Sequence, residues 1–227
     1  MPRLRCLCLI LAAFLTACAG TKETHNTAAM RERTLQRAMA QGLVDVAAVI
    51  PGIDIDLRYS TANNITRRPL YPSYMPCLLL ASTAERLRHA QSLLNAQGYA
   101  LRVWDAWRPP EVQDRLNDAS GRTGLFLDPD VGWSRHCGGI SVDATLIDLH
   151  GHEQRMPTAF DDKLGPSATD YTGGDPVVRR NLAILHTAMR TAGLIPLADE
   201  WWHFDNIDHI KSPVPIIRGP QIGVIVR

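Results

Sequence analysis

The stretch from Ser134 to Leu149 constrains the fold most, because a glycine-bearing turn is followed by regular alternation of apolar and polar residues. The two sets of alternating positions are Ile140, Val142, Ala144 and Leu146 on one side and Ser141, Asp143 and Thr145 on the other. A period of two predicts a β-strand over residues 138–149. Strands with one apolar face are typical of antiparallel sheets with one covered face, so this segment favours such a sheet.

Other segments predict the elements that surround this strand. Residues 82–97 show apolar side chains at helical spacing, and the run Ser82 to Glu85 has the pattern of a capping box. Asp175, followed by proline, is expected to cap a second long helix. Strand alternation recurs over residues 53–58 and 100–107. We therefore predict an α+β fold, a single domain with a central, mostly antiparallel sheet flanked by helices.

Length and composition narrow the class of function. The chain has 227 residues, a formal net charge of +1 and 45% hydrophobic residues. It is too apolar and too nearly neutral to be disordered, and its charges are too balanced to bind nucleic acid through bulk electrostatics. We expect one domain over residues 41–227, which is long enough to bury a sizeable core, and no nucleic-acid partner.

The first twenty residues predict where in the cell the protein is located. Two arginines precede an apolar run of about a dozen residues, which is typical of a secretory signal and too short for a permanent membrane span. The run ends in Leu15-Thr16-Ala17-Cys18, which resembles the bacterial lipobox, although an ordinary signal peptide with an incidental cysteine is an alternative. We expect a lipoprotein signal peptide over residues 1–17, lipidation and membrane attachment at Cys18, and a tether with a short helix over residues 18–40. The expected location is the bacterial cell envelope, on a lipoprotein of the outer membrane that faces the periplasm.

Three separated motifs supply complementary chemistry. His136 precedes the central predicted strand, Asp143 lies within it, and His203 ends the run Glu200-Trp201-Trp202-His203. Two imidazoles and one carboxylate are a standard ligand set for a catalytic zinc ion with a fourth position for water. A nearby glutamate that is not a ligand, such as Glu200, can then move the proton of that water. Arg108 ends a predicted strand before a proline, where a fixed guanidinium can meet the oxyanion that forms.

Together these motifs resemble the zinc D-alanyl-D-alanine dipeptidases, a family known from bacterial vancomycin resistance and dipeptide scavenging. The resemblance rests on SxHxxGxxxD over residues 134–143, on ExWH over residues 200–203 and on the arginine before proline at position 108. It extends in the family's order from about residue 44 to residue 206. It implies one Zn²⁺ per chain, held by His136, Asp143 and His203.

The resemblance also implies a role for four further residues. Glu200 becomes the general base and acid, Arg108 the transition-state stabiliser, and Ser134 and Asp161 the residues that hold the substrate ammonium group. A buried carboxylate that faces a free amino terminus favours a substrate of two residues over a longer chain.

Some residues leave alternatives open. Ser141 stands where the family usually has alanine, and Cys137 directly follows a predicted ligand. In an oxidising envelope Cys137 and Cys77 are able to pair as a disulfide, but the sequence does not show that they are close. His150 and His152 suggest a second metal site, yet a solvated loop is the favoured interpretation because no carboxylate or cysteine with ligand spacing joins them.

The expected function is zinc-dependent hydrolysis of D-alanyl-D-alanine, or a similar small D,D-dipeptide, in cell-wall metabolism or glycopeptide resistance. One alternative is a D,D-carboxypeptidase or endopeptidase that trims peptidoglycan stems with the same metal set. A peptidoglycan-binding lipoprotein without turnover is another. The expected partners are the dipeptide and, through Cys18, a membrane, while the oligomeric state stays open.

Overall fold

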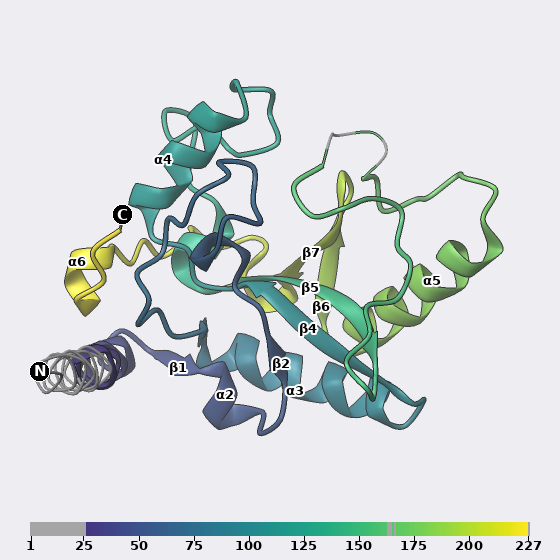
Figure 1. The fold of residues 1–227 in the computed structure, drawn as a ribbon, viewed down its shortest axis with the longest axis horizontal. Helices are drawn as coiled ribbons and strands as arrows, with labels where there is room; N and C mark the ends of the chain where they lie inside the picture. The colour runs from purple at the N-terminus through teal and green to yellow at the C-terminus, as the bar shows by residue number, and fades with distance from the viewer. Residues whose placement is uncertain (1–25, 163–164, 166, 227) are drawn as a thin grey trace, which may run out of the picture.

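The computed structural model describes residues 26–162, 165 and 167–226 (Figure 1). The signal peptide expected over residues 1–17, lipidation at Cys18 and the tether up to residue 25 lie outside the described residues. Residues 26–39 are helical, within the stretch for which a short helix is expected. The expected domain follows this helix.

A five-stranded sheet forms the centre of the molecule, with the strand order β2-β4-β5-β7-β6. Its strands are β2 (Asp54–Ile55), β4 (Tyr99–Asp105), β5 (Ser141–Asp148), β6 (Leu194–Leu197) and β7 (Glu200–Asn206). Only the β2–β4 pair of this sheet is parallel, and the other neighbouring pairs are antiparallel. A small second sheet pairs β1 and β3 antiparallel, with the bounds Leu43–Asp45 and Leu78–Leu80. The prediction of an α+β fold with a mostly antiparallel central sheet is confirmed.

Two long helices, α3 (Ala81–Asn95) and α5 (Pro176–Thr191), contact each other and the strands of the sheet. α5 begins where the sequence predicts, because the Asp175 carboxylate accepts hydrogen bonds from the N–H groups of Val177 and Val178. Besides these two and the amino-terminal helix, the described residues form the shorter helices α2 (Val46–Val49), α4 (Pro110–Ala119) and α6 (Gly219–Ile222), with 3₁₀ turns at Arg58–Ser60, Arg135–Gly138 and Ile207–His209.

The capping box predicted at the start of α3 is wrong. Leu80, the last residue of β3, stands at the N-cap position and makes no capping bond through its side chain. Ser82 lies inside the helix, where its hydroxyl accepts a hydrogen bond from the side chain of Asn206 at 3.3 Å. The start of α3 is therefore set by the strand that leads directly into it, and the serine ties the helix to the end of β7.

Both faces of β5 are buried, which differs from the one-sided strand that its alternation predicts. Val142 and Leu146 belong to the main hydrophobic core, as expected. Asp143 and Thr145 alternate with them and are also buried, because other segments of the chain form pockets over this face of the strand. The polar face of this strand therefore serves an interior site rather than bulk solvent.

The end of the chain returns to the middle of the fold. Trp107 donates a hydrogen bond from its indole Nε1 to the carbonyl oxygen of Ile217, at 3.1 Å. The N–H of Ile217 in turn donates to the carbonyl oxygen of Cys137, at 3.0 Å. Trp107 and Ile217 share a second hydrophobic cluster with Ala38 of the amino-terminal helix. Both ends of the described chain therefore brace the segments that carry Arg108 and His136.

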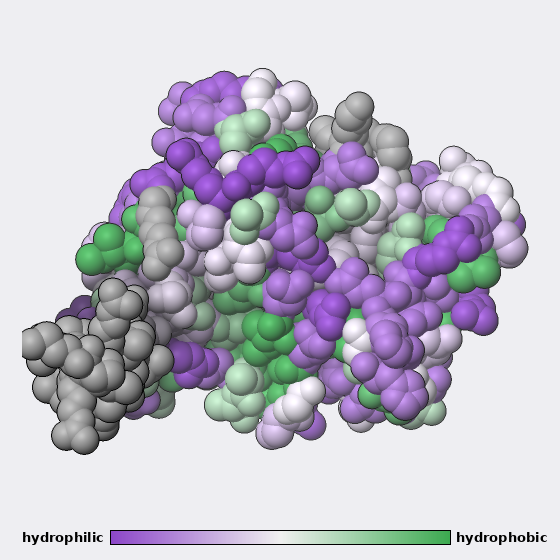
Figure 2. Space-filling model, in the orientation of Figure 1, coloured by the Kyte–Doolittle hydropathy of each residue, from purple (hydrophilic) through white to green (hydrophobic). Residues whose placement is uncertain are grey.

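Polar residues cover most of the face seen in Figure 2, and apolar residues show in small patches between them. Within the part of the chain that the structure describes, no helix combines the length and the hydropathy that a membrane crossing requires.

Candidate active site

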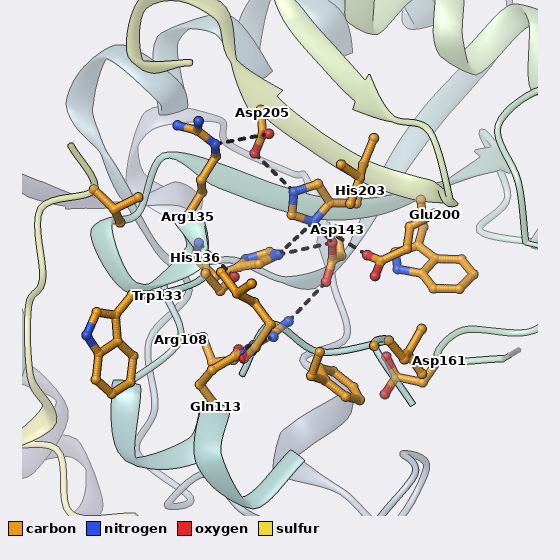
Figure 3. A pocket seen from close by; sticks show the side chains of 18 residues that line it. Arg108, Gln113, Trp133, Arg135, His136, Asp143, Asp161, Glu200, His203 and Asp205 are labelled. Atoms are coloured by element: carbon orange, nitrogen blue, oxygen red, sulfur yellow. Dashed lines mark hydrogen bonds and ion pairs between the residues drawn. The ribbon is translucent and has the colours of Figure 1, made fainter. Parts of the chain in front are cut away.

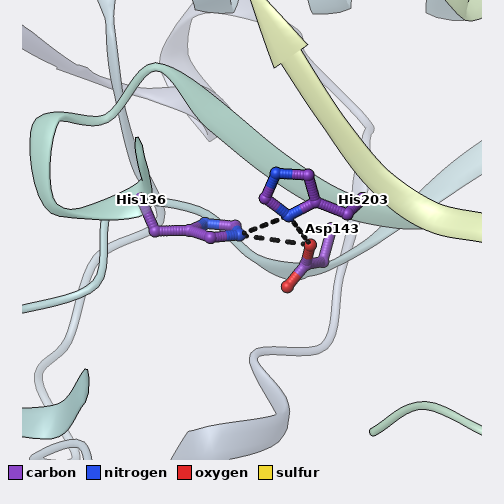
Figure 4. A group of neighbouring side chains, drawn as sticks. All are labelled: His136, Asp143 and His203. Carbon is purple, nitrogen blue, oxygen red and sulfur yellow. Dashed lines mark hydrogen bonds and ion pairs between the residues drawn. The ribbon is translucent and has the colours of Figure 1, made fainter. Parts of the chain in front are cut away.

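Strand register brings the three predicted metal ligands together (Figure 4). Asp143 on β5 lies directly opposite His203 on β7, and the turn that enters β5 carries His136. His136 Nε2 lies 3.1 Å from His203 Nδ1 and 3.2 Å from Asp143 Oδ1. His203 Nδ1 lies 3.1 Å from the same carboxylate oxygen. All three side chains are buried, and their ligand atoms lie within 4.8 Å of one another.

Each imidazole makes a hydrogen bond through its outer nitrogen, the one that points away from the cluster. This bond determines whether the inner nitrogen, which faces the cluster, carries a proton or a lone pair. His136 Nδ1 donates to the carbonyl oxygen of Ala106 at 2.6 Å, and His203 Nε2 donates to the Asp205 carboxylate at 3.0 Å. The inner nitrogens of the neutral rings then carry lone pairs. Two lone pairs and the carboxylate of Asp143 face one point, where they repel one another unless a cation lies between them. The donor set therefore fits a divalent metal ion.

The pKa shifts reflect the same attraction for a cation. Burial alone would raise the pKa of Asp143, but the two imidazoles hold it well below its ordinary value. Burial alone would lower the pKa of His203, but Asp143 and Asp205 raise it well above its ordinary value. A proton and a metal ion therefore compete for this cluster.

Glu200 is the first residue of β7, and its carboxylate lies beside the cluster (Figure 3). Its Oε2 is 3.8 Å from His203 Nδ1, the closest of its ion-pair contacts to the predicted ligands. Burial raises the pKa of Glu200 to about 7, against the opposing effect of the His203 charge. A carboxyl group with such a pKa can accept and release a proton near neutral pH.

Arg108 is held from three sides at the edge of the cluster. Its Nε donates to Asp105 at 2.8 Å, and its first terminal nitrogen donates to Gln113, also at 2.8 Å. The guanidinium lies over the rings of Tyr59 and Phe126, with distances to the ring centres of 5.1 and 5.6 Å. Its second terminal nitrogen is left to face Asp143, at 3.5 Å. The fold thus presents one edge of a buried cation to the site.

Ser134 and Asp161 both line the same cavity as the predicted ligands. The Ser134 hydroxyl caps the turn before β5 and accepts a weak hydrogen bond from the N–H of His136, at 3.4 Å. Asp161 accepts the phenolic proton of Tyr59, with both carboxylate oxygens 3.1 Å from it, and has a positive φ of 57°. Burial raises the pKa of Asp161 well above its ordinary value. A cation close to this carboxyl group would favour its charged form.

The cavity has a volume of about 380 Å³ and brings together every predicted site residue of the catalytic domain (Figure 3). Its polar lining residues include Gln113, Arg135 and Asp205 besides the predicted site residues. Apolar side chains complete the lining, namely Leu125, Phe126, Leu127, Trp133, Leu197, Trp202 and Val214. A small polar molecule with short apolar side chains fits such a lining.

Sequence reasoning missed the residues that hold the predicted ones in place. They are Tyr59 under Asp161, Asp105 and Gln113 around Arg108, Tyr71 on Asp105, and Asp205 behind His203. A usable signal existed for two of them, because Asp105 lies only three residues before Arg108, near the end of the predicted strand, and Asp205 lies two residues after His203 of the ExWH motif. The others come from unrelated parts of the chain and only the fold identifies them.

The structure also answers two questions that the sequence left open. Cys77 and Cys137 are both buried free thiols, so no disulfide joins them. His152 lies in an exposed turn, where its Nδ1 contacts the Asp148 carboxylate at 3.0 Å. Neither His150 nor His152 belongs to the three-residue group that fits a metal ion, which agrees with a solvated loop.

Comparisons with known proteins match the whole of this site. The sequence profile of a family described as D-ala-D-ala dipeptidase matches residues 39–121 and 126–217. The D-alanyl-D-alanine dipeptidase of Escherichia coli (strain K12) is 33% identical over 163 residues, which are 72% of this chain and 83% of the relative. The proteins of that name from Streptomyces coelicolor and Enterococcus faecalis are 27% and 25% identical, over 70% and 75% of this chain and 88% and 94% of the relatives. Because the profile spans most of the chain and every motif that builds the cavity, the chain belongs to the D-ala-D-ala dipeptidase family.

Proposed function

We propose that this protein hydrolyses D-alanyl-D-alanine, or a similar small D,D-dipeptide, with a zinc ion held by His136, Asp143 and His203. The observation that carries the proposal is a buried set of three converging donor atoms in a cavity that also holds Glu200 and Arg108. Family membership and the names of the curated relatives support the substrate. When bound, zinc polarises a carbonyl group and lowers the pKa of a water molecule to about 7.

Glu200 moves the proton in this proposal. Its carboxylate, beside His203, accepts a proton from the water that attacks the substrate carbonyl. The same carboxyl group then donates this proton to the nitrogen of the leaving amino acid, which departs as a neutral amine. The pKa of about 7 that burial gives Glu200 suits both transfers near neutral pH.

Arg108 supplies positive charge to the oxygen of the attacked carbonyl group. Its guanidinium is already fixed by Asp105 and Gln113, so little reorganisation is needed when negative charge develops on that oxygen. The two aromatic rings against it exclude water and strengthen the electrostatic effect.

Asp161 and Ser134 bind the substrate's free ammonium group in this proposal. A substrate ammonium would return Asp161 to its charged form and offset the cost of its burial. A peptide with a blocked or distant amino terminus would leave the carboxyl group without that partner. This contrast favours a dipeptidase over an enzyme that trims longer stems.

Hydrolysis of D-alanyl-D-alanine by the zinc-loaded protein tests the proposal directly. We expect release of D-alanine, and we expect Glu200→Gln to lower kcat by about 100-fold or more at unchanged zinc content. Zinc bound stoichiometrically without hydrolysis would instead indicate a binding protein. Undiminished turnover by Glu200→Gln would remove the proposed proton path.

The choice between dipeptidase and carboxypeptidase needs a second substrate. We expect N-acetyl-D-alanyl-D-alanine and a pentapeptide stem to be cleaved far more slowly than the free dipeptide. Asp161→Asn should raise KM for the free dipeptide while changing the rate with the acetylated one little. Equal cleavage of free and acetylated dipeptide would favour the carboxypeptidase.

The envelope location is part of the same proposal. The supporting observation is the signal-like segment that ends at Cys18. Cells that express the full chain should incorporate radiolabelled palmitate into it and retain it in the membrane fraction. The Cys18→Ser variant should do neither, and equal labelling of both proteins would argue against lipidation at this residue.

A further inference from the structure

The two imidazoles of the cluster are supported in different ways on their outer sides. His136 Nδ1 donates to a backbone carbonyl, that of Ala106. His203 Nε2 donates instead to a side chain, the carboxylate of Asp205, at 3.0 Å. The support of one predicted ligand is thus built into the main chain, whereas the support of the other depends on one replaceable residue.

Asp205 is itself held in place by two further groups, of which Figure 3 shows Arg135. The hydroxyl of Ser141, a fully buried side chain, donates to the same carboxylate oxygen that His203 contacts. Arg135 Nε lies 3.4 Å from the other oxygen. The guanidinium of Arg135 is anchored by hydrogen bonds of 2.7 and 2.6 Å to the carbonyl oxygens of His209 and Ile210. The carboxylate therefore has little freedom to turn away from His203.

Strand register explains why these groups meet. Ser141 on β5 is the direct cross-strand partner of Asp205 on β7, just as Asp143, two residues later on β5, is the partner of His203, two residues earlier on the antiparallel strand β7. Side chains two residues apart on a strand share a face of the sheet. The inner pair supplies two predicted ligands, and the outer pair lies directly behind one of them.

We propose that Asp205, held by Ser141 and Arg135, is a positioning residue that fixes the orientation and tautomer of His203 and so sets the metal affinity of the site. The inference rests on the proposed metal-binding role of His203. A hydrogen bond on the outer nitrogen keeps the proton there, which leaves the lone pair of Nδ1 directed at the metal position. Ser141 acts through Asp205, because its hydroxyl donates to the Asp205 carboxylate.

Zinc affinity of the metal-free protein, measured by competition with a chromophoric chelator, tests the proposal. We expect Asp205→Ala to weaken zinc binding by about 10- to 100-fold, the range usual for residues that orient a ligand from behind. Ser141→Ala should weaken it by a smaller factor. The double variant should bind zinc no more weakly than Asp205→Ala alone, because the serine has no other route to the metal position.

Asp208→Ala is the matched control. It removes a carboxylate three residues further along the chain, where Asp208 forms an exposed ion pair with Arg86. We expect its zinc affinity to equal that of the unmodified protein. Equal weakening by Asp208→Ala and Asp205→Ala would overturn the proposal, and so would additive effects of the Ser141 and Asp205 substitutions.

Two further measurements distinguish a loss of positioning from a loss of folding. Far-ultraviolet circular dichroism of the zinc-free variants checks that they are folded, and Asp205→Asn serves if Asp205→Ala is not. The asparagine keeps a hydrogen-bond acceptor but loses the charge, so we expect a weakening between those of the unmodified protein and the alanine variant. Unchanged zinc affinity in folded Asp205→Asn and Asp205→Ala variants would contradict the inference. If the unmodified protein binds zinc but cleaves no dipeptide, only the proposed function is contradicted.

Discussion

Single residues in this site depend on charged neighbours that are equally buried. Arg108 is about 4% exposed and Asp105 is fully buried, so each of the two charges balances the other in a medium of low dielectric constant. The phenol of Tyr71 donates a further hydrogen bond to Asp105, at 2.7 Å. The ion pair and the hydrogen bonds around it offset the cost of burying these two charges. One edge of the arginine guanidinium stays free to face the cavity.

Replacement of Asp105 by asparagine should therefore damage both stability and catalysis. We expect Asp105→Asn to lower the free energy of unfolding by about 3–5 kcal/mol, since it removes the closer of the two carboxylates that balance the charge of a buried guanidinium. A small displacement of Arg108 should also lower kcat by about 100-fold. Urea denaturation and initial rates measure the two effects.

Asp54→Asn is the comparison for that variant. It breaks the bidentate contact between Asp54 and Arg102, but this pair is partly exposed and lies outside the cavity. We expect a loss of at most about 1 kcal/mol and an unchanged kcat. Similar losses in both variants would mean that burial of the Asp105 pair is not what matters.

At the scale of the elements, α5 is joined to β7 by a buried histidine. His186 Nε2 donates to the carbonyl oxygen of Trp201, at 2.8 Å. Burial lowers the pKa of His186 to about 4, from an ordinary value of 6.5. The structure makes it a contact between a covering helix and the strand that carries His203.

This contact predicts a pH dependence of stability. Because the pKa is lower in the folded protein, the unfolded chain takes up the proton first as the pH falls. The stabilisation is fully present above pH 6.5 and is lost as the pH falls from there toward 4, by on the order of 3 kcal/mol at the lower limit. Denaturation of the unmodified protein and of His186→Gln between pH 7 and 4 should show this loss only in the former. Parallel curves for the two proteins would assign the acid sensitivity to other groups.

Local patterns predicted the elements and the cluster, but not what surrounds them. His136 and Asp143 lie within one turn and strand, so their proximity follows from local structure alone. The pairing of Asp143 with His203 depends on the register of two distant strands, which a motif can suggest but periodicity cannot supply. Gln113 is an ordinary polar residue in the sequence, and only its contact with Arg108 distinguishes it from a solvated one. The same limit explains why the polar face of β5 was expected to meet solvent.

At the scale of the whole molecule, the carboxyl-terminal segment presses on the turn that carries His136. A Cβ atom at Gly138 would lie only 2.6 Å from the carbonyl oxygen of Pro215, so the two backbones fit together only because this residue has no side chain. We expect Gly138→Ala to lower the free energy of unfolding by about 1–3 kcal/mol and to weaken zinc binding, because the segment or the turn must move.

Gly174→Ala provides the comparison, since a Cβ atom there meets no other atom within 4 Å. Thermal unfolding and chelator competition on both variants separate a local clash from a general effect of replacing glycine. A zinc affinity of Gly138→Ala equal to that of Gly174→Ala would show that the closing segment does not govern the turn.

The cavity draws its working groups from segments spread over nearly a hundred residues of chain, from Arg108 to Asp205, and the closing segment beyond them braces two of these segments. No shorter stretch of the polypeptide holds a complete set. An unfolded chain is therefore expected to be inert toward any dipeptide around it. Turnover is expected only in a chain in which these separate segments have come together, so that activity also reports on folding.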